Sequence, residues 1–352
     1  MIALPELAPA RPPCSQAERA GAESLQDSLG RVGLAGRIES LRAPTSPAWV
    51  PLLRALLRVW AVALVAAYRP VPAIVLAALA VASGFPSLSA LIRYLPLLGN
   101  ETQNVVASVE GTQSNAKPLI AVAHVDTHPL ATAPMSKARS ALAAAFGWGT
   151  LAAAVVGRPD MTVWRVVLTL FAVESLFTLA WLARRELSVT SEMPDDNTSG
   201  LLALVSLAML LNDHRPLRNV WIVGSGAGTS GGHGLVEFLR RNKDLRESWV
   251  VEIDTLGAGE VVASPLTPRF PGPGTPPSLI RALVAASRQT GDPLSVRRIR
   301  RAHSDARAAL RLRTGAITLT AGLSHPAGQR GPDPANAERA ARVVDRLARS
   351  ED

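Results

Sequence analysis

The stretch KPLIAVAHVD, residues 117–126, decides the fold when it is read with RNVWIVGSG (residues 218–226) and ESWVVEID (residues 247–254). Each is an apolar run of strand length that ends in small or polar residues. A helix-length apolar segment, residues 200–211, lies between the first two. Alternation of short apolar runs with helical segments is typical of α/β proteins. We therefore predict a doubly wound mixed sheet flanked by helices.

The segments around these three strands extend the same pattern. The run at residues 101–111 predicts a strand that neighbours the one ending at Asp126. Beyond residue 254 we expect a Pro- and Gly-rich loop, and then helices and one more strand. The N-terminal part, residues 15–41, predicts a helix with one buried face and a short strand. The later expected elements are a helix near 278–290, a helix from 304, a strand at 315–322 and a closing amphipathic helix at 335–349.

Two long apolar stretches interrupt this domain, which otherwise covers residues 1–352. They lie at residues 48–93 and 138–185, and they account for a hydrophobic content of 48%. A bilayer core is crossed by about 20 apolar residues in a helix. Each stretch is long enough for a hairpin of two spans with a tight turn. We predict two inserted membrane hairpins, with buried core helices or interfacial helices as the alternatives.

Charges within and beside the hairpins bear on how they lie in a membrane. Arg165 and Glu174 weaken the last span, because a charge at mid-membrane costs about 2.5–3.5 kcal/mol. Arginines and lysines gather on the side of the polar domain, and few lie in the hairpin turns. The positive-inside rule then places the polar domain in the cytoplasm. The N-terminal residues lack the basic and apolar regions of a cleavable signal peptide.

The remaining composition excludes several classes of function. Cys14 is the only cysteine, so there is no disulfide framework and no thiolate metal cluster, and we expect it to be an incidental thiol in a disordered leader. The net charge is +9, with basic runs at residues 240–246 and 295–303. Aromatic residues make up only 4%, and none is interleaved with those arginines. We therefore predict no nucleic-acid binding.

Acidic and histidine residues follow the strands at four places. They are AHVD (residues 123–126), PDDNTSG (194–200), EIDTLG (252–257) and SHP (324–326). Carboxylate and imidazole groups are zinc ligands, and loops at the carboxyl ends of strands meet at one edge of an α/β sheet. The pattern therefore predicts a zinc site assembled from distant loops.

The order and neighbours of these motifs resemble those of the zinc-dependent exopeptidases typified by bacterial leucyl aminopeptidases and glutamate carboxypeptidase. The resemblance implies that His124, Asp196 and Asp254 bind one zinc ion, and that Asp196 bridges to a second ion held also by His325. Asp195 is the alternative bridge. Asp126 is implied to orient His124 from behind through a hydrogen bond that fixes the imidazole tautomer.

The chain departs from that family at GAGTSGGHG, residues 226–234. The family has two adjacent glutamates in this turn, and here Gly228 stands at the position of the general base and Thr229 at a ligand of the second ion. Glycine cannot accept a proton, and a neutral hydroxyl is a poor zinc ligand. His233 could ligate, but we expect it on the surface of the turn. One zinc site looks complete and the second does not.

Three hypotheses follow from the sequence. The first is a membrane-associated, catalytically impaired relative of the zinc aminopeptidases that uses its fold for binding or assembly. Relatives without the glutamates, such as the transferrin receptor, make this class plausible. The second is an active metallo-exopeptidase with an unorthodox or mononuclear site that cleaves peptides at a free amino terminus. The third is a membrane scaffold without metal. The expected partners are membrane lipid and a peptide ligand or protein partner.

Overall fold

A computed structural model of the 352-residue chain describes residues 10–45, 49–67, 69–83, 99–113, 115–127, 137–156, 162–187, 197–257, 259–267, 273–299, 304–321 and 332–351. The chain forms two compact units. The first, the α/β unit, comprises residues 1–45, 96–129 and 191–352. The second, the helical unit, comprises residues 46–95 and 130–190, and these ranges include both of the apolar stretches.

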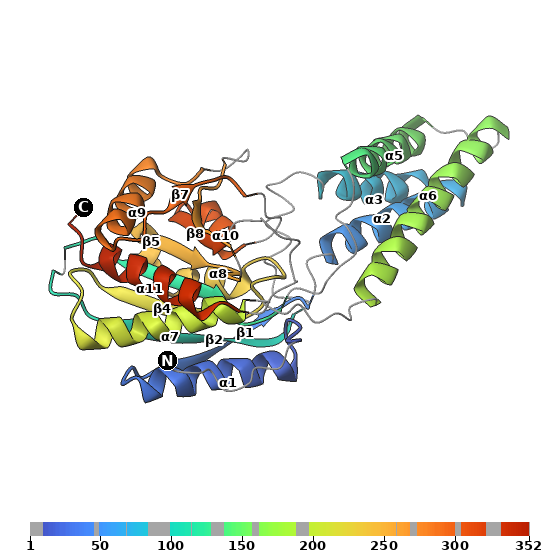
Figure 1. The fold of residues 1–352 in the computed structure, drawn as a ribbon. Coiled ribbons are helices and arrows are strands. Elements are labelled where there is room, and N and C mark those ends of the chain that lie inside the picture. The colour runs from blue at the N-terminus through green and yellow to red at the C-terminus, as the bar shows by residue number, and fades with distance from the viewer. Residues whose placement is uncertain are drawn as a thin grey trace. The chain divides into compact units, whose positions relative to one another are not determined.

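The α/β unit is built on an eight-stranded mixed sheet with the order β1-β2-β4-β3-β5-β8-β6-β7 (Figure 1). Its central strands β4, β3, β5 and β8 run parallel, whereas β2 is antiparallel to both β1 and β4. The prediction of a mixed α/β sheet flanked by helices is confirmed. The strands are β1 Arg37–Ala43, β2 Asn100–Val109, β3 Leu119–His124, β4 Val220–Ser225, β5 Trp249–Ile253, β6 Val261–Ser264, β7 Ser295–Val296 and β8 Gly315–Ala321.

One expected strand pairing is wrong. β2 and β3 follow one another in the chain but are not neighbours in the sheet, because β4 lies between them. Val105 pairs with Gly224 on one edge of β4, and Leu119 pairs with Val220 on the other. Strands that are consecutive in sequence often pair, but an α/β crossover can place a later strand between them. The sequence pattern identifies strands and does not specify this order.

Helices cover both faces of the sheet. One face packs against α1 (Gln16–Arg31), α7 (Thr198–Asp213), α9 (Pro277–Gln289) and α11 (Pro334–Ala348). The other packs against α8 (His233–Arg241) and α10 (Asp305–Arg311), and a short 3₁₀ helix, η2 (Lys243–Glu247), follows α8. Along β3 the side chains alternate between the two cores, and all six residues are buried. Burial on both faces explains why β3 is an uninterrupted apolar run.

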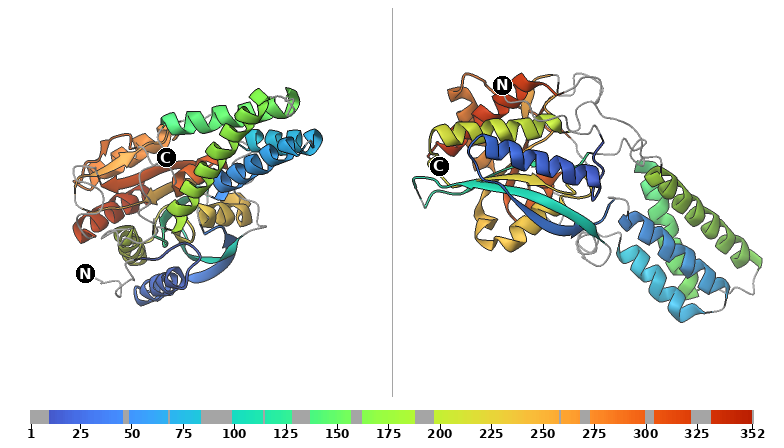
Figure 2. Two further views of the ribbon diagram at one scale, coloured as in Figure 1. Left: turned by 90° about the vertical axis from the view of Figure 1, so that its right-hand side faces the viewer. Right: turned by 90° about the horizontal axis from the view of Figure 1, so that it is seen from below.

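The helical unit consists of α2 (Trp49–Ala66), α3 (Pro70–Ala82), α5 (Lys137–Val156) and α6 (Thr162–Leu187). These helices pack on one another as a bundle (Figure 2). Its small apolar core includes Val62, Val65 and Leu168. Phe146 of α5 meets Phe171 of α6 edge to face, with ring centroids 5.4 Å apart. Gly149 allows this approach, since a Cβ atom there would lie 2.7 Å from the Phe171 ring.

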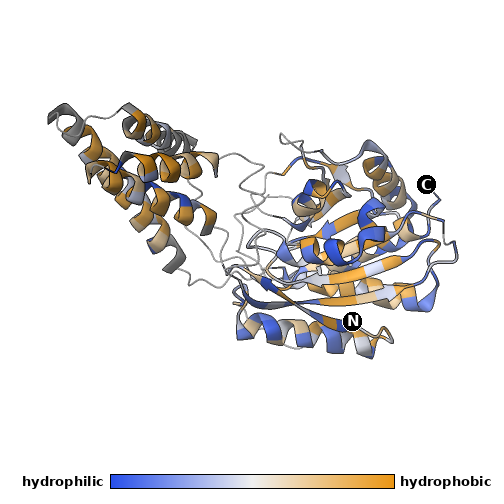
Figure 3. Ribbon diagram, turned by 180° about the vertical axis from the view of Figure 1, so that it is seen from behind, coloured by the Kyte–Doolittle hydropathy of each residue, from blue (hydrophilic) through white to orange (hydrophobic). Residues whose placement is uncertain are grey.

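Most of the described residues of the helical unit are hydrophobic (Figure 3). Fifteen large hydrophobic side chains are exposed in the described part of the protein, and twelve of them belong to this unit. They include Trp60, Val71, Trp148, Val155 and Phe177, each more than half exposed. One helix, Val166–Arg184, is long and apolar enough to cross a membrane by length and composition. An apolar exterior of this extent marks a surface that water does not normally cover.

Ionisable side chains lie inside the helical unit. Nη1 of Arg58 in α2 donates to Oε2 of Glu174 in α6 over 3.1 Å, and the two side chains are 3% and 13% exposed. Thr178 donates to the other carboxylate oxygen over 2.7 Å. Arg54 donates to the backbone oxygen of Ser83 over 2.7 Å at the end of α3. The charge that weakens α6 as an isolated span is thus paired with a cation from α2. The side chain of Arg165 lies outside the described residues.

Candidate metal centre

His124 and Asp254 lie at the ends of adjacent parallel strands. His124 is the last residue of β3 and Asp254 follows β5, and the register pairs Val122 with Glu252 two residues earlier. Nε2 of His124 is 3.4 Å from Oδ1 of Asp254. Both residues are buried. The carboxyl edge of the sheet therefore brings together two of the four residues that the resemblance implies as metal ligands.

The contact that Nδ1 of His124 makes shows which ring nitrogen carries the hydrogen. Nδ1 is 2.6 Å from the backbone oxygen of Asp126. A carbonyl oxygen can only accept, so Nδ1 carries the hydrogen and donates it. In neutral His124 the lone pair on Nε2 then faces the Asp254 carboxylate, which is another acceptor. Two acceptors at this distance require a proton or a cation between them.

The distance between these two atoms agrees with a shared zinc ion. Zinc bonds of about 2.0–2.2 Å at a tetrahedral angle place two ligand atoms roughly 3.4 Å apart. A charge-assisted N–H···O bond is shorter, at about 2.7–2.9 Å. Asp196 and its alternative Asp195, together with His325, lie outside the described residues. Within the described ranges, no group of three or more possible ligands is present. His124 and Asp254 thus form half of a possible site.

Asn197 connects the strand ends that carry these two residues. Its Nδ2 donates to the backbone oxygen of His124 over 3.1 Å, and its Oδ1 accepts from the backbone N–H of Thr255 over 3.0 Å. Gly200 makes room for this amide, since a Cβ atom there would lie 2.1 Å from Oδ1 of Asn197. The asparagine of the DDNTSG motif has no role that the sequence alone indicates. This contact supplies one.

Three non-glycine residues around the site have positive φ angles. They are Asn197 (60°), Ala227 (50°) and Thr255 (53°), and the described residues contain only two others. For a β-branched threonine this conformation is strained. Hydrogen bonds hold Thr255, whose hydroxyl donates to Oδ1 of Asp254 over 2.7 Å. Backbone strain of this kind persists where the surrounding structure fixes a functional geometry.

Two buried carboxylates bind the backbone of the turn at residues 227–229, where the resemblance implies two glutamates. Oδ1 of Asp126 accepts from the N–H of Gly228 over 2.8 Å, and Oδ2 accepts from the N–H of Thr229 over 2.9 Å and from its hydroxyl. Oε1 of Glu18 in α1 accepts from the N–H of Ala227 over 2.7 Å. Three successive N–H groups therefore bind protein carboxylates. Asp126 therefore accepts from His124 through its backbone oxygen, and its carboxylate accepts from the turn. Oδ1 of Asp126 lies 3.8 Å from Nδ1 of His124.

Gly228 is packed too closely to carry a side chain. A Cβ atom there would lie 2.4 Å from Cβ of His124, 3.2 Å from Oδ2 of Asp305 and 3.3 Å from Oδ1 of Asp126. A contact of 2.4 Å with the Cβ of a strand residue cannot be relieved by a rotamer change. Thr229 is buried, and its hydroxyl donates to Asp126. The packing thus leaves no room for a glutamate side chain at residue 228.

Asp305, the first residue of α10, is a buried carboxylate that the sequence analysis did not identify. Its N–H donates to Oε1 of Glu252 over 2.6 Å, and Oδ2 accepts from the hydroxyl of Ser225. Its Oδ1 has no hydrogen-bond partner among the described residues. The only signal in the sequence was its place after Ser304, which reads as an ordinary helix start.

Burial alters the acidity of these groups. It raises the pKa of Glu18 to about 8, and the nearby charge of Asp126 adds to this effect. It also raises the pKa of Asp305 to about 6, against the opposing effect of the Ser225 hydrogen bond. A group that is half protonated near neutral pH can accept or donate a proton. Glu18 and Asp305 therefore differ from ordinary surface carboxylates.

The N-terminal segment contributes to the site, contrary to our expectation of a disordered leader. Arg11 is 1% exposed, and its Nε donates to the backbone oxygen of Val125 over 2.7 Å. The N–H of Cys14 donates to Oε2 of Glu18 over 2.6 Å, and its thiol donates to Ala43. Burial raises the pKa of the Cys14 thiol to about 12, which leaves it unreactive.

His233 is not on the surface of the turn, so that expectation is wrong. It is the first residue of α8 and is 6% exposed. Its N–H donates to the backbone oxygen of Ala227 over 3.3 Å, and that of Gly234 donates to Gly226 over 2.9 Å. These bonds fold the glycine-rich turn back onto the start of the helix, which draws His233 inside. No local pattern indicates this burial, because glycine-rich turns are usually exposed.

Comparison with known proteins identifies solved structures with a similar fold. No family model and no curated protein matches the sequence. Solved structures similar to the chain include an aminopeptidase from Aneurinibacillus sp. strain AM-1, with a TM-score of 0.56, 11% identity, and coverage of 96% of this chain and 89% of that one. BSAP, a zinc aminopeptidase from Bacillus subtilis, gives a TM-score of 0.54 and 11% identity, with 96% and 90% covered.

A third similar structure is a glutaminyl cyclase from Bacteroides thetaiotaomicron, bound to N-acetylhistamine. Its TM-score is 0.54 at 13% identity, with 99% of this chain and 100% of that one covered. At such low identity the likeness concerns the fold and not the activity. The protein has the α/β fold of zinc aminopeptidases and of this cyclase.

Proposed function

We propose that this protein is a membrane-associated member of the zinc aminopeptidase group that holds one zinc ion and is impaired as a peptidase. His124, Asp196, Asp254 and His325 would hold the ion. The observation that carries the proposal is the pair of facing acceptors, Nε2 of His124 and Oδ1 of Asp254, at 3.4 Å. Asp126 fixes the tautomer that turns the Nε2 lone pair toward Asp254.

Impairment follows from the turn at Gly228. When bound, zinc supplies Lewis-acid chemistry to a hydrolase. The chain must add a proton acceptor, and loss of a positioned acceptor lowers rates by about 10²–10⁴. Gly228 has none, and the hydroxyl of Thr229 is already a donor to Asp126. The site can therefore bind the amino end of a peptide, or support a protein partner, without rapid turnover.

An active metallo-exopeptidase is the second candidate, and Asp305 favours it. Its Oδ2 lies 3.2 Å from the point where a Cβ of residue 228 would be, so it fills part of the space of the missing side chain. Its Oδ1 is buried and unpartnered among the described residues. A carboxylate with a pKa near 6 is suited to accept a proton at neutral pH.

Membrane association rests on the helical unit. Its apolar side chains are exposed and its Arg58–Glu174 ion pair is buried, whereas a water-soluble domain usually buries apolar side chains and exposes charged ones. Ionisable groups in membrane segments face the interior and pair with one another. We propose that both hairpins lie in the bilayer, with the α/β unit on the cytoplasmic side. Protease accessibility in sealed right-side-out vesicles tests this: cleavage of the α/β unit only after the vesicles are permeabilised supports it, and cleavage in the intact vesicles refutes it.

The proposed zinc chemistry is tested on purified full-length protein. We expect about one zinc ion per chain by mass spectrometry of metals, and loss of that ion in His124→Ala and Asp254→Asn. Hydrolysis of leucine p-nitroanilide should be slow or absent. Rapid hydrolysis that Asp305→Asn abolishes would favour the second candidate. If the folded protein binds no zinc, both metal hypotheses fail and the third hypothesis, a membrane scaffold without metal, remains.

A further inference from the structure

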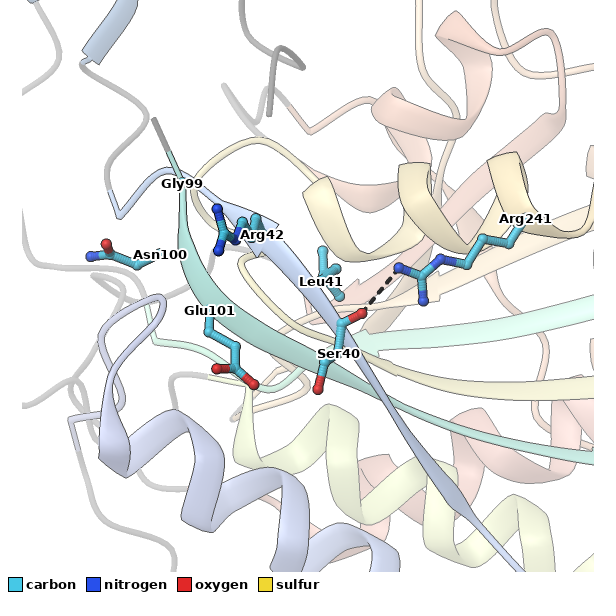
Figure 4. A pocket seen from close by; sticks show the side chains of 7 residues that line it. All are labelled: Ser40, Leu41, Arg42, Gly99, Asn100, Glu101 and Arg241. Carbon is cyan, nitrogen blue, oxygen red and sulfur yellow. Dashed lines mark hydrogen bonds between the residues drawn. The ribbon is translucent and has the colours of Figure 1, made fainter. Parts of the chain in front are cut away.

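A pocket of about 730 Å³ opens on the α/β unit, and its lining includes none of the residues of the candidate metal centre (Figure 4). It is formed by the end of β1, the start of β2 and the last turn of α8. Ser40, Arg42, Asn100, Glu101 and Arg241 supply its polar groups. Figure 4 shows the guanidinium groups of Arg42 and Arg241 on either side of Leu41, with the carboxylate of Glu101 directed away from both.

The two arginines are held in different ways. Arg241 is fixed, because its Nη2 donates to the backbone oxygen of Ser40 over 3.0 Å and its Nε donates to Glu237 over 3.0 Å. Arg42 forms no ion pair within the described parts of the chain, although Glu101 is its cross-strand neighbour. Its five donors remain available. Guanidinium groups bind phosphate oxygens with fixed geometry.

The charges of the pocket favour a ligand with a single negative charge. Arg42 and Arg241 are positive and Glu101 is negative, so the lining residues carry a net charge of +1, which Glu237, paired with Arg241 from outside the lining, lowers further. A phosphodiester has one negative charge. A free phosphate or a phosphate monoester has about 1.5–2 at neutral pH, and Glu101 repels the second charge.

The position of the pocket in the chain indicates where such a ligand would come from. Arg42 lies seven residues before α2 begins, and Gly99 directly precedes Asn100, the first residue of the strand by which the chain returns from the first apolar stretch. Ala43 pairs with Asn100 at this end of the sheet. Arginines next to membrane helices attract anionic lipid headgroups.

We propose that this pocket binds the phosphodiester headgroup of an anionic phospholipid. Arg42 and Arg241 take the phosphate oxygens, and Ser40 and Asn100 donate to the remaining headgroup oxygens. The inference rests on the proposed membrane association. It adds that the α/β unit contacts specific lipid at the root of the first hairpin.

The test uses full-length protein in detergent and three probes: dihexanoyl phosphatidylglycerol, dihexanoyl phosphatidylcholine and inorganic phosphate. Saturable binding is expected for phosphatidylglycerol, and at least tenfold weaker binding for the other two. Arg42→Gln/Arg241→Gln should lower phosphatidylglycerol binding at least tenfold, whereas Arg42→Lys should lose less. Arg288→Gln, an exposed arginine on α9, is the matched control and should bind normally.

Three results would overturn the proposal. Equal binding of the two lipids would show no charge selection, and inorganic phosphate that binds as tightly as phosphatidylglycerol would indicate a free-anion site. Undiminished binding by a double variant with a normal melting temperature would exclude these arginines. Extraction of membranes with carbonate separates the two proposals: release of the wild type refutes membrane insertion, while retention of all variants leaves it intact.

Discussion

The backbone N–H of Gly228 donates to Oδ1 of Asp126 over 2.8 Å, and no space is left for a side chain at residue 228. Gly228 at this position is therefore not simply the absence of a side chain. The turn is in contact with His124 at the end of β3, and its N–H groups donate to Asp126. Restoring a glutamate by substitution should consequently disturb the site and not repair it.

Gly228→Glu is expected to destabilise the protein by about 1–3 kcal/mol, the cost of overpacking a dense site. It should also add no aminopeptidase activity, because His124 must shift to admit the new Cβ. Thermal unfolding and hydrolysis of leucine p-nitroanilide measure the two effects. Gly30→Glu is the control, since nothing lies within 4 Å of a Cβ at this helical position. Robust hydrolysis by a stable Gly228→Glu variant would contradict the described packing.

Asn197→Ala is expected to weaken zinc binding about 10–100-fold, as loss of an orienting contact typically does. The substitution removes the hydrogen bonds to His124 and Thr255 and introduces strain at φ 60°. Asn197→Gly removes the same bonds without the strain, so it should bind zinc as weakly but unfold at a higher temperature. Competition with a chromogenic chelator measures affinity, and Asn100→Ala serves as the control. Unchanged affinity in both variants would show that this amide does not shape the site.

The raised pKa of Glu18 predicts a pH-dependent stability. An unfolded glutamate titrates near 4.5, and in the folded protein the pKa is about 8. The folded state binds the extra proton, so its stabilising contribution is complete below pH 4.5 and is lost as the pH rises through 8. Between about pH 7 and 8.5, where Asp305 with its pKa of about 6 is largely ionised, the free energy of unfolding should fall.

Glu18→Gln should flatten that decline, because the amide cannot ionise. Thermal unfolding at half-unit steps of pH measures the slope. Glu23→Gln changes an exposed residue of the same helix and should keep the wild-type slope. Identical slopes for the wild type and Glu18→Gln would assign the pH dependence to another group.

Removal of one partner of the Arg58–Glu174 pair is expected to cost about 3–5 kcal/mol, since it leaves a buried charge uncompensated. Arg58→Met and Glu174→Leu should each lower the melting temperature and the amount of protein in membranes. The double variant should recover much of the loss. Arg69→Met alters an exposed arginine of the same unit and should have little effect. A double variant as unstable as the sum of the single ones would mean that the two residues act independently.

The parts of the fold that local pattern encodes could be predicted. Apolar runs ending at His124 and Asp254 became the buried parallel strands β3 and β5, because strands buried on both faces have no polar alternation. β6 and β7 were missed, since they have only four and two residues and lie beside a Pro- and Gly-rich loop. Their pairing depends on partners elsewhere in the sheet.

The contacts that define the candidate site could be predicted only in part. His124 and Asp254 are in motifs, but Glu18 and Asp305 looked like acidic residues in the first turn of a helix, where they commonly offset the helix dipole. Their burial results from contacts with residues 209 and 80 positions away, Ala227 and Ser225. Local spacing carries no information about such contacts.

The hydrogen bond from Asn197 to His124 joins residues 73 positions apart in the chain. Nearly everything between them is the α5–α6 hairpin and its connections. The bond therefore closes the loop that carries α5 and α6 at its base, beside the candidate metal ligand His124. The chain leaves and re-enters the α/β unit close to two residues that bond to each other, so a displacement of that loop would act on His124, at the carboxyl end of β3, through Asn197.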